Sequence, residues 1–200
     1  DRAAAVLQTW YPGARGGKTV AEILFGDTSP SGKLPVTFYR SLEELPAFED
    51  YSMKGRTYRY MTGEALYPFG YGLTYGDVSV RGTELLTKEE DTRAVVLKVT
   101  VQNDGKTATD DVVQLYCKDR ESAYAVPNHR LCAFQRVHLG AGETISIEMN
   151  VPGSAFCAVN EDGEFIRDSR SYTLYAGVGQ PDARTEKLTG HQSAAIDITF

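Results

Sequence analysis

The chain has 200 residues, of which 42% are hydrophobic and 24% charged, and its formal net charge at neutral pH is −6. This composition is typical of a soluble globular protein, and the length allows one or two domains. A net negative charge argues against a general nucleic-acid binder, which needs a basic face. Because no apolar run approaches the ~18 residues that a membrane span needs, we expect neither nucleic acid nor a membrane among its partners.

The first region, residues 1–38, has the pattern of an α/β layer. Residues 4–10 form a short apolar run of the kind found in buried parallel strands. Residues 18–25 predict a short helix that ends at Gly26, and residues 34–38 alternate like a second strand. A strand–helix–strand unit of this size cannot bury a core of its own, so it must pack against the rest of the chain or a partner.

The second region, residues 39–76, begins with an irregular polar stretch and continues with a stretch rich in aromatic residues and glycine. A flexible linker would be rich in Gly and Ser or in charge, and poor in aromatic residues. We therefore interpret residues 39–76 as a long, ordered connector. Its aromatic residues in the second half are Tyr58, Tyr60, Tyr67, Phe69, Tyr71 and Tyr75.

The third region, residues 77–200, shows period-two alternation of apolar side chains in at least five segments. The clearest are residues 95–101, 113–117, 145–151, 172–178 and 196–200. Asp104-Gly105 and Asp162-Gly163 have the composition of tight hairpin turns, and residues 140–142 separate two further strands. About seven short strands without a strong helical period indicate an immunoglobulin-like antiparallel β-sandwich.

The cysteines and histidines suggest no metal or redox site. Cys117, Cys132 and Cys157 form no CxxC pair, and buried, reduced thiols are the simplest interpretation. This interpretation favours a reducing compartment such as the cytoplasm, and no N-x-S/T sequon or targeting segment argues for secretion. The three histidines lack metal-ligand spacing, and residues 160–163 resemble a hairpin turn more than a calcium loop.

The glycine-rich stretch before the first predicted helix, residues 13–17, is conceivable as a phosphate cradle. It has neither the GxGxxG nor the GK[ST] pattern, so a packed loop at a domain interface explains it better. No serine or cysteine has the surroundings of a nucleophile, and the paired carboxylates lie in polar segments. We predict no cofactor, no metal and no catalytic residue on this chain.

A series of longer phrases resembles glycoside hydrolase family 3, the β-glucosidase and β-xylosidase family. They run in order along the chain from about residue 3: AVLQTWYPG at 5–13, AEILFGD at 21–27, PSGKLPVT at 30–37, RTYRY at 56–60, LYPFGYGLTY at 66–75 and VVQLY at 112–116. The resemblance implies a C-terminal portion of such an enzyme. Residues 1–38 would end an (α/β)6 sandwich domain, 39–76 would be the connector, and 77–200 would be a fibronectin type III-like domain.

The resemblance also implies where the chemistry lies. Members of this family retain anomeric configuration with a carboxylate nucleophile and a general acid/base about 5 Å apart. The nucleophilic Asp usually precedes a Trp, whereas Thr9 precedes Trp10, the single tryptophan here. The acid/base Glu usually lies earlier in the (α/β)6 domain than the matching part of this chain. We therefore expect both carboxylates elsewhere in the enzyme.

Two residues are candidates for substrate contact. Trp10 and the following loop come after a predicted strand, and such loops gather at the ligand crevice of α/β layers. Arg15 replaces the Glu of the family's common Gly-x-Glu-Gly-Gly phrase and is the best polar candidate in that loop. The connector aromatics fit either a hydrophobic latch between domains or a platform for sugar rings.

The predicted function is thus a structural part of a retaining β-glycosidase that hydrolyses β-glucosides or β-xylosides, inactive as an isolated chain. Its partners would be the remaining domains of the same enzyme and a β-linked glycoside or oligosaccharide. The alternative is a stand-alone carbohydrate-binding or domain-interaction module.

Overall fold

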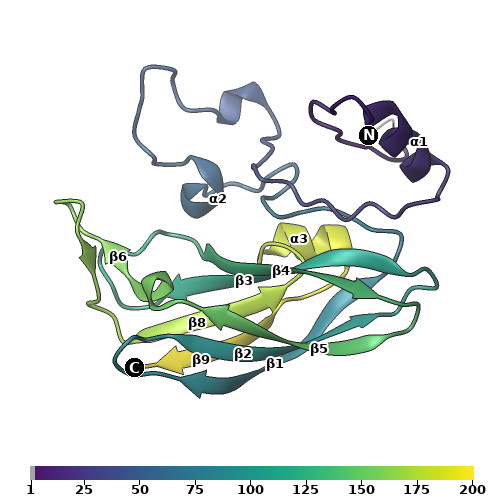
Figure 1. Cartoon of the computed structure of the whole chain (residues 1–200). Helices are drawn as coiled ribbons and strands as arrows, with labels where there is room; N and C mark the ends of the chain where they lie inside the picture. Colours follow the sequence, from purple (N-terminus) through teal and green to yellow (C-terminus); the bar gives the residue numbers. More distant parts are fainter. Residues whose placement is uncertain (1–2) are drawn as a thin grey trace.

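The computed structural model describes residues 3–200, so Asp1 and Arg2 of the predicted first region lie outside the described residues. Two antiparallel sheets pack face to face, one of order β1–β2–β5 and one of order β4–β3–β8–β9 (Figure 1). The strands are β1 Val78–Lys88, β2 Val95–Asn103, β3 Thr109–Asp119, β4 Arg130–Leu139, β5 Thr144–Val151, β8 Ser171–Gly177 and β9 Ala194–Thr199. A small hairpin pairs β6 Ala158–Val159 with β7 Phe165–Ile166.

Alternating apolar side chains build the core of this sandwich. In β2, Val95, Leu97, Val99 and Val101 are buried, whereas Lys98 between them is exposed. The partner strand β5 places Val151 opposite Val95. The two inner faces therefore enclose one continuous apolar core, and the predicted antiparallel β-sandwich is confirmed.

Two turn predictions had different outcomes. Gly163 has a φ of 81° and closes the β6–β7 hairpin as expected. The hairpin predicted at Asp104-Gly105 is wrong, because β2 and β3 belong to different sheets and this turn carries the chain between them. A Cβ on Gly105 would lie 2.7 Å from the backbone nitrogen of Asp77, so close backbone approach requires glycine there.

The first region contains its predicted helix but not its predicted strands. Helix α1, Gly16–Leu24, ends before Gly26, which has a φ of 83°. Residues 4–10 form no strand and are exposed, and residues 34–38 make only one isolated bridge, from Phe38 to Tyr67. A parallel strand needs neighbouring strands for its backbone hydrogen bonds, and residues 3–200 supply none to this segment.

The third region also contains a helix that its sequence pattern did not predict. Helix α3, Ala183–Thr189, connects β8 to β9. Asp182 caps it by accepting a hydrogen bond from the Thr185 backbone N–H, and Gly190 ends it in the left-handed conformation. Seven residues with one large apolar side chain give too little periodicity to detect.

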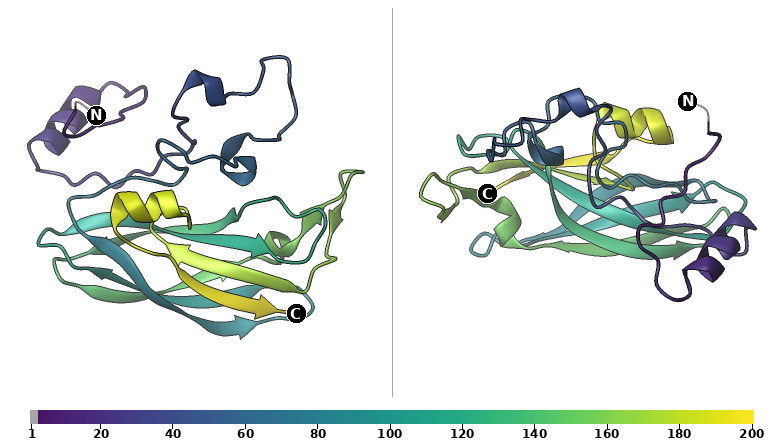
Figure 2. Two further views of the ribbon diagram at one scale, coloured as in Figure 1. Left: turned by 180° about the vertical axis from the view of Figure 1, so that it is seen from behind. Right: turned by 90° about the horizontal axis from the view of Figure 1, so that it is seen from above.

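The connector lies across the outer face of the four-stranded sheet, beside α3 (Figure 2). It includes two short helices, η1 Leu42–Glu44 and α2 Thr57–Tyr60, while η2 Gly153–Phe156 belongs to the sandwich. Residues 29–38 run alongside residues 66–75, joined by backbone hydrogen bonds such as Leu34 N–H to the Tyr71 carbonyl at 2.9 Å. Within residues 3–200, no helix combines the length and apolar character needed to cross a bilayer.

Candidate functional site

The junction between the connector and strand β3 contains a group of buried polar residues, among them Asp111 and Gln114. Strand β3 directs Val113 and Leu115 into the sandwich core, where both are fully buried. Its alternate residues Gln114 and Tyr116 face the connector and are buried there as well. Because both faces of β3 are covered, residues 113–117 in the middle of the strand are all buried.

Gln114 and Tyr116 bind the connector backbone at Gly70. The Gln114 amide donates to the Gly70 carbonyl at 3.0 Å, and the Tyr116 hydroxyl donates to Gln114 Oε1 at 2.6 Å. Gly70 has a φ of 78°, and a Cβ there would overlap with both side chains. Two independent constraints therefore require glycine in the middle of the LYPFGYGLTY phrase.

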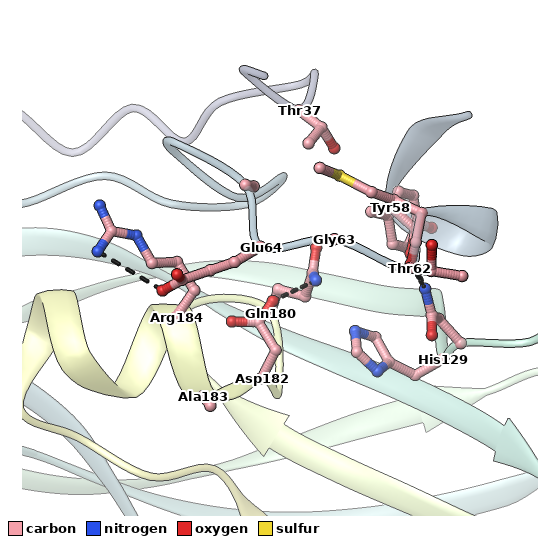
Figure 3. Close-up of a pocket in the computed structure, with 13 residues that line it drawn as sticks. Thr37, Tyr58, Thr62, Gly63, Glu64, His129, Gln180, Asp182, Ala183 and Arg184 are labelled. Atoms are coloured by element: carbon pink, nitrogen blue, oxygen red, sulfur yellow. Dashed lines mark hydrogen bonds and ion pairs between the residues drawn. The ribbon is translucent and has the colours of Figure 1, made fainter. Parts of the chain in front are cut away.

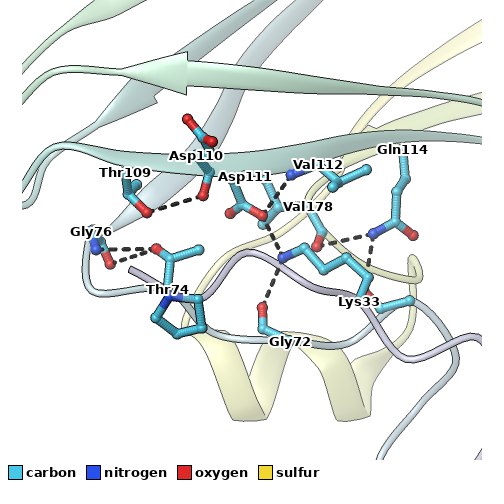
Figure 4. Close-up of polar contacts among 12 residues, drawn as sticks. Lys33, Gly72, Thr74, Gly76, Thr109, Asp110, Asp111, Val112, Gln114 and Val178 are labelled. Atoms are coloured by element: carbon cyan, nitrogen blue, oxygen red, sulfur yellow. Dashed lines mark hydrogen bonds and ion pairs between the residues drawn. The ribbon is translucent and has the colours of Figure 1, made fainter. Parts of the chain in front are cut away.

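A buried ion pair joins the first region to the same strand (Figure 4). Lys33 Nζ lies 2.6 Å from Asp111 Oδ1, and the two side chains are only 9% and 4% exposed. Lys33 also donates to the Gly72 carbonyl at 2.8 Å, and Asp111 accepts from the Val112 backbone N–H at 2.7 Å. Burial raises the pKa of Asp111, and Lys33 opposes that shift. One lysine thus ties residues 30–37, the connector and β3 together.

Aromatic rings fill the rest of the junction. Tyr58 stacks on Phe69 with ring centroids 4.2 Å apart and meets Tyr116 edge-on at 6.2 Å. The Tyr58 hydroxyl accepts from the Leu131 backbone N–H at 3.1 Å. Since the faces of these rings contact one another, this part of the connector has the geometry of a latch between segments.

A pocket of about 310 Å³ opens beside this latch, between the connector, the segment before β4 and the start of α3 (Figure 3). Its polar wall includes His129, Gln180 and Asp182, and its opposite wall includes Thr37. Burial, with a smaller effect of Lys118, lowers the pKa of His129 to about 4, so this imidazole is neutral at pH 7. Burial raises the pKa of Asp182, against hydrogen bonds from Thr185, Arg184 and Gln180.

The residues predicted to touch substrate lie outside this pocket. Trp10 is 47% exposed, has a φ of 52°, and its ring is tilted against Phe38 with centroids 6.5 Å apart. Arg15 is exposed just before α1, and its side chain makes no hydrogen bond or ion pair within residues 3–200. The pocket residues His129 and Gln180 were not predicted, because neither belongs to a recognisable local motif.

The cysteines lie in or beside the sandwich. Cys117 is buried in β3, Cys132 lies half-buried in β4, and Cys157 is buried after η2. Burial raises the pKa of Cys132 to about 12 and raises that of Cys117 as well. Such thiols are poor nucleophiles. Across the described part of the chain, no three His, Cys, Asp or Glu side chains are grouped so as to hold a metal ion.

Two segments of the chain match models of known protein families. Residues 1–75 match the family model of the glycosyl hydrolase family 3 C-terminal domain, and residues 111–180 match that of a fibronectin type III-like domain. The first model describes a domain of glycosyl hydrolases, and the second describes a separate domain type. The chain belongs to glycoside hydrolase family 3, as the sequence phrases predicted.

Relatives are similar along nearly all of the chain. A xylan 1,4-β-xylosidase of Xylanibacter ruminicola is 37% identical over 186 residues, and a periplasmic β-glucosidase of Salmonella typhimurium is 32% identical over 192 residues. These alignments cover 92% and 89% of this chain but 21% and 25% of the relatives. The chain therefore spans about a fifth to a quarter of the curated relatives that it matches.

Solved structures agree with the fold. A β-glucosidase from Erythrobacter marinus superposes with a TM-score of 0.74 at 31% identity, covering 92% of this chain and 23% of that protein. A β-glucosidase involved in saponin metabolism from intestinal bacteria gives a TM-score of 0.77 at 29% identity, covering 94% of this chain and 25% of that protein.

Proposed function

We propose that this chain is a structural part of a retaining β-glycosidase acting on β-glucosides or β-xylosides. The observation that carries the proposal is the similarity along most of the chain to proteins named β-xylosidase and β-glucosidase. The two catalytic carboxylates would lie in the remaining three quarters of the enzyme. In this assignment the chain scaffolds and does not catalyse.

Exposed apolar side chains support a partner surface formed by α1 and the loop that follows η1. Phe25 is 84% exposed, and Phe48 and Tyr51 are each 87% exposed. Both segments project from the side of the connector that faces away from the sandwich (Figure 1). Large aromatic side chains exposed in this way are typical of interaction surfaces. The proposed occupant is the remaining part of the same enzyme, including the sheet to which residues 4–10 would contribute a strand.

Trp10 and Arg15 remain proposed substrate contacts in that assembly. Both side chains are free to meet another domain, because Trp10 is half-exposed and Arg15 is exposed. In the complete enzyme, Arg15→Ala should raise KM for an aryl glycoside if Arg15 lines the rim of the catalytic pocket. An unchanged KM would assign Arg15 to the surface.

The proposal is tested first by activity. The purified 200-residue chain should release no aryl group from aryl β-glucosides or aryl β-xylosides, and the complete enzyme should hydrolyse at least one of them with retention of configuration. Robust turnover by the chain alone, or no turnover by the complete enzyme, would overturn the assignment.

Assembly provides a second test. When the chain is co-expressed with the remaining part of the enzyme, the two should co-purify, and Phe48→Asp with Tyr51→Asp should weaken the association. Phe165→Asp is the matched control, because Phe165 is 74% exposed on the β6–β7 hairpin of the sandwich. Equal effects of both changes would contradict the proposed surface.

The alternative is a stand-alone carbohydrate-binding module that uses the connector aromatics as its platform. Tyr58 stacks on Phe69, and Tyr67 stacks on Tyr71 with ring centroids 5.6 Å apart. Each of these rings therefore has one face covered by another ring and unavailable to a sugar. Binding of cello- or xylo-oligosaccharides that is lost in Tyr71→Ala would favour this alternative.

A further inference from the structure

The pocket between the connector and α3 contains buried polar atoms without partners. His129 Nε2, Gln180 Oε1 and Thr37 Oγ1 are all buried and accept or donate no hydrogen bond within residues 3–200. They come from three separate segments, yet all three residues line the same pocket. Leaving such groups unsatisfied costs about 1–3 kcal/mol each, so the arrangement indicates a site for a hydrogen-bonding ligand.

The orientation of Gln180 is fixed by its surroundings. Its side-chain amide nitrogen donates to the Asp182 carboxylate, which in its ionised form can only accept. The carbonyl oxygen Oε1 is therefore the atom left without a partner. Gln180 is 9% exposed, so this oxygen is presented from a rigid, buried side chain.

The charges around the pocket select the class of ligand. The carboxylates of Asp182 and Glu64 line it and disfavour an anion, while the Arg184 guanidinium disfavours a cation. His129 is neutral at pH 7 because burial lowers its pKa to about 4, so its ring offers one donor and one acceptor. A hydroxyl group both donates and accepts, and it matches all three unpaired atoms.

The size of the pocket limits the ligand further. A volume of about 310 Å³ is at the lower end of the range for small-molecule sites. The nearest aromatic ring, Tyr58, is already stacked on Phe69, so a ligand would be held by hydrogen bonds and not by ring stacking. We propose that this pocket binds a small neutral polyhydroxyl compound of monosaccharide size. Of the connector aromatics, this pocket includes only Tyr58, and the proposal does not depend on the proposed glycosidase activity.

The experiment is a titration of the 200-residue chain with D-glucose, D-xylose and glycerol, followed by the imidazole ¹⁵N signals in NMR. At least one of the sugars should shift the His129 Nε2 signal with a Kd on the order of 1 mM, since ligands of this size gain little energy per atom. Glycerol, with fewer hydroxyl groups, should bind more weakly.

Variants locate the site. Gln180→Leu should weaken binding by about 10-fold or more, because an apolar group would replace the acceptor. Thr37→Val, which preserves shape, tests the opposite wall if Gln180→Leu fails to fold. Gln135→Leu is the matched control, because Gln135 is exposed on β4 and does not line the pocket. No shift of His129 with any of the three compounds at ~10 mM, or binding by Gln180→Leu and Thr37→Val as tight as binding by the unchanged chain, would overturn the proposal.

Discussion

Replacing Asp111 by asparagine should remove much of the stability of the junction between the first region and the sandwich. Asparagine preserves the size of the side chain but leaves the Lys33 ammonium buried without its counter-charge. Removing one partner of a buried ion pair typically costs about 3–5 kcal/mol, because the remaining charge is uncompensated. The hydrogen bond from Lys33 to the Gly72 carbonyl remains, which places the expected loss toward the lower end of this range.

Two spectroscopic probes separate local release from global unfolding. Trp10 is the single tryptophan, and its ring contacts Phe38. Phe38 is bound to the connector, because its backbone N–H donates to the Tyr67 carbonyl. The fluorescence of Trp10 therefore reports whether the first region is still bound to the connector. Far-UV circular dichroism reports the sandwich. In urea, Asp111→Asn should lower the midpoint of the Trp10 transition more than that of the circular dichroism transition.

The matched control is Asp104→Asn, which disrupts the ion pair of Asp104 with Arg81 on the surface, where the side chains are 35% and 46% exposed. Exposed pairs contribute about 0–1 kcal/mol, so this variant should barely change stability. The double variant Lys33→Met, Asp111→Leu should recover most of the loss, because no buried charge remains. Equal losses for the Asp111 and Asp104 variants would refute the reasoning.

Three further outcomes are expected. Burial lowers the pKa of His129 from 6.5 to about 4, so the folded state keeps this imidazole neutral where the unfolded state protonates it. The free energy of unfolding should therefore be unaffected by His129 above pH 6.5 and fall by about 3 kcal/mol as the pH drops from 6.5 to 4. His129→Phe should flatten the urea stability profile over this pH window, and an unchanged profile would assign the loss to other groups. Gly70→Ala should cost at least ~1 kcal/mol in the Trp10 transition, because of its positive φ and its contact with Gln114. Asp182→Ala should cost about 1 kcal/mol by uncapping α3, measured by thermal unfolding, and no change would show that the cap is dispensable.

Much of the sandwich could be predicted because its strands carry their own signal. Strand β2 alternates Leu97, Val99 and Val101 with Lys98, Thr100 and Gln102, which predicts one buried face without knowledge of any partner. Helix α3 was missed although Asp182 and Gly190 have suitable chemistry for its ends. One large apolar residue within seven cannot establish a helical face.

The first region and the pocket depend on contacts that are distant in sequence. The apolar run at residues 4–10 forms no strand, because strand formation needs neighbours that residues 3–200 do not provide. The phrases around Lys33, Gly70 and Gln114 were recognisable separately, but the sequence did not show that they meet at one junction. His129 and Gln180 have no local pattern, and only the fold brings them into one pocket.

The covering of β3 on both faces has a consequence for anyone who moves this module between enzymes. A cut between residues 76 and 77 would follow the sequence boundary but leave Gln114, Tyr116 and Asp111 facing water without their partners. The transferable unit therefore comprises the sandwich together with residues 29–76, which include Tyr58 against Tyr116. Chimeras joined upstream of residue 29 should remain soluble, whereas those joined at residue 77 should aggregate through the exposed outer face of the four-stranded sheet.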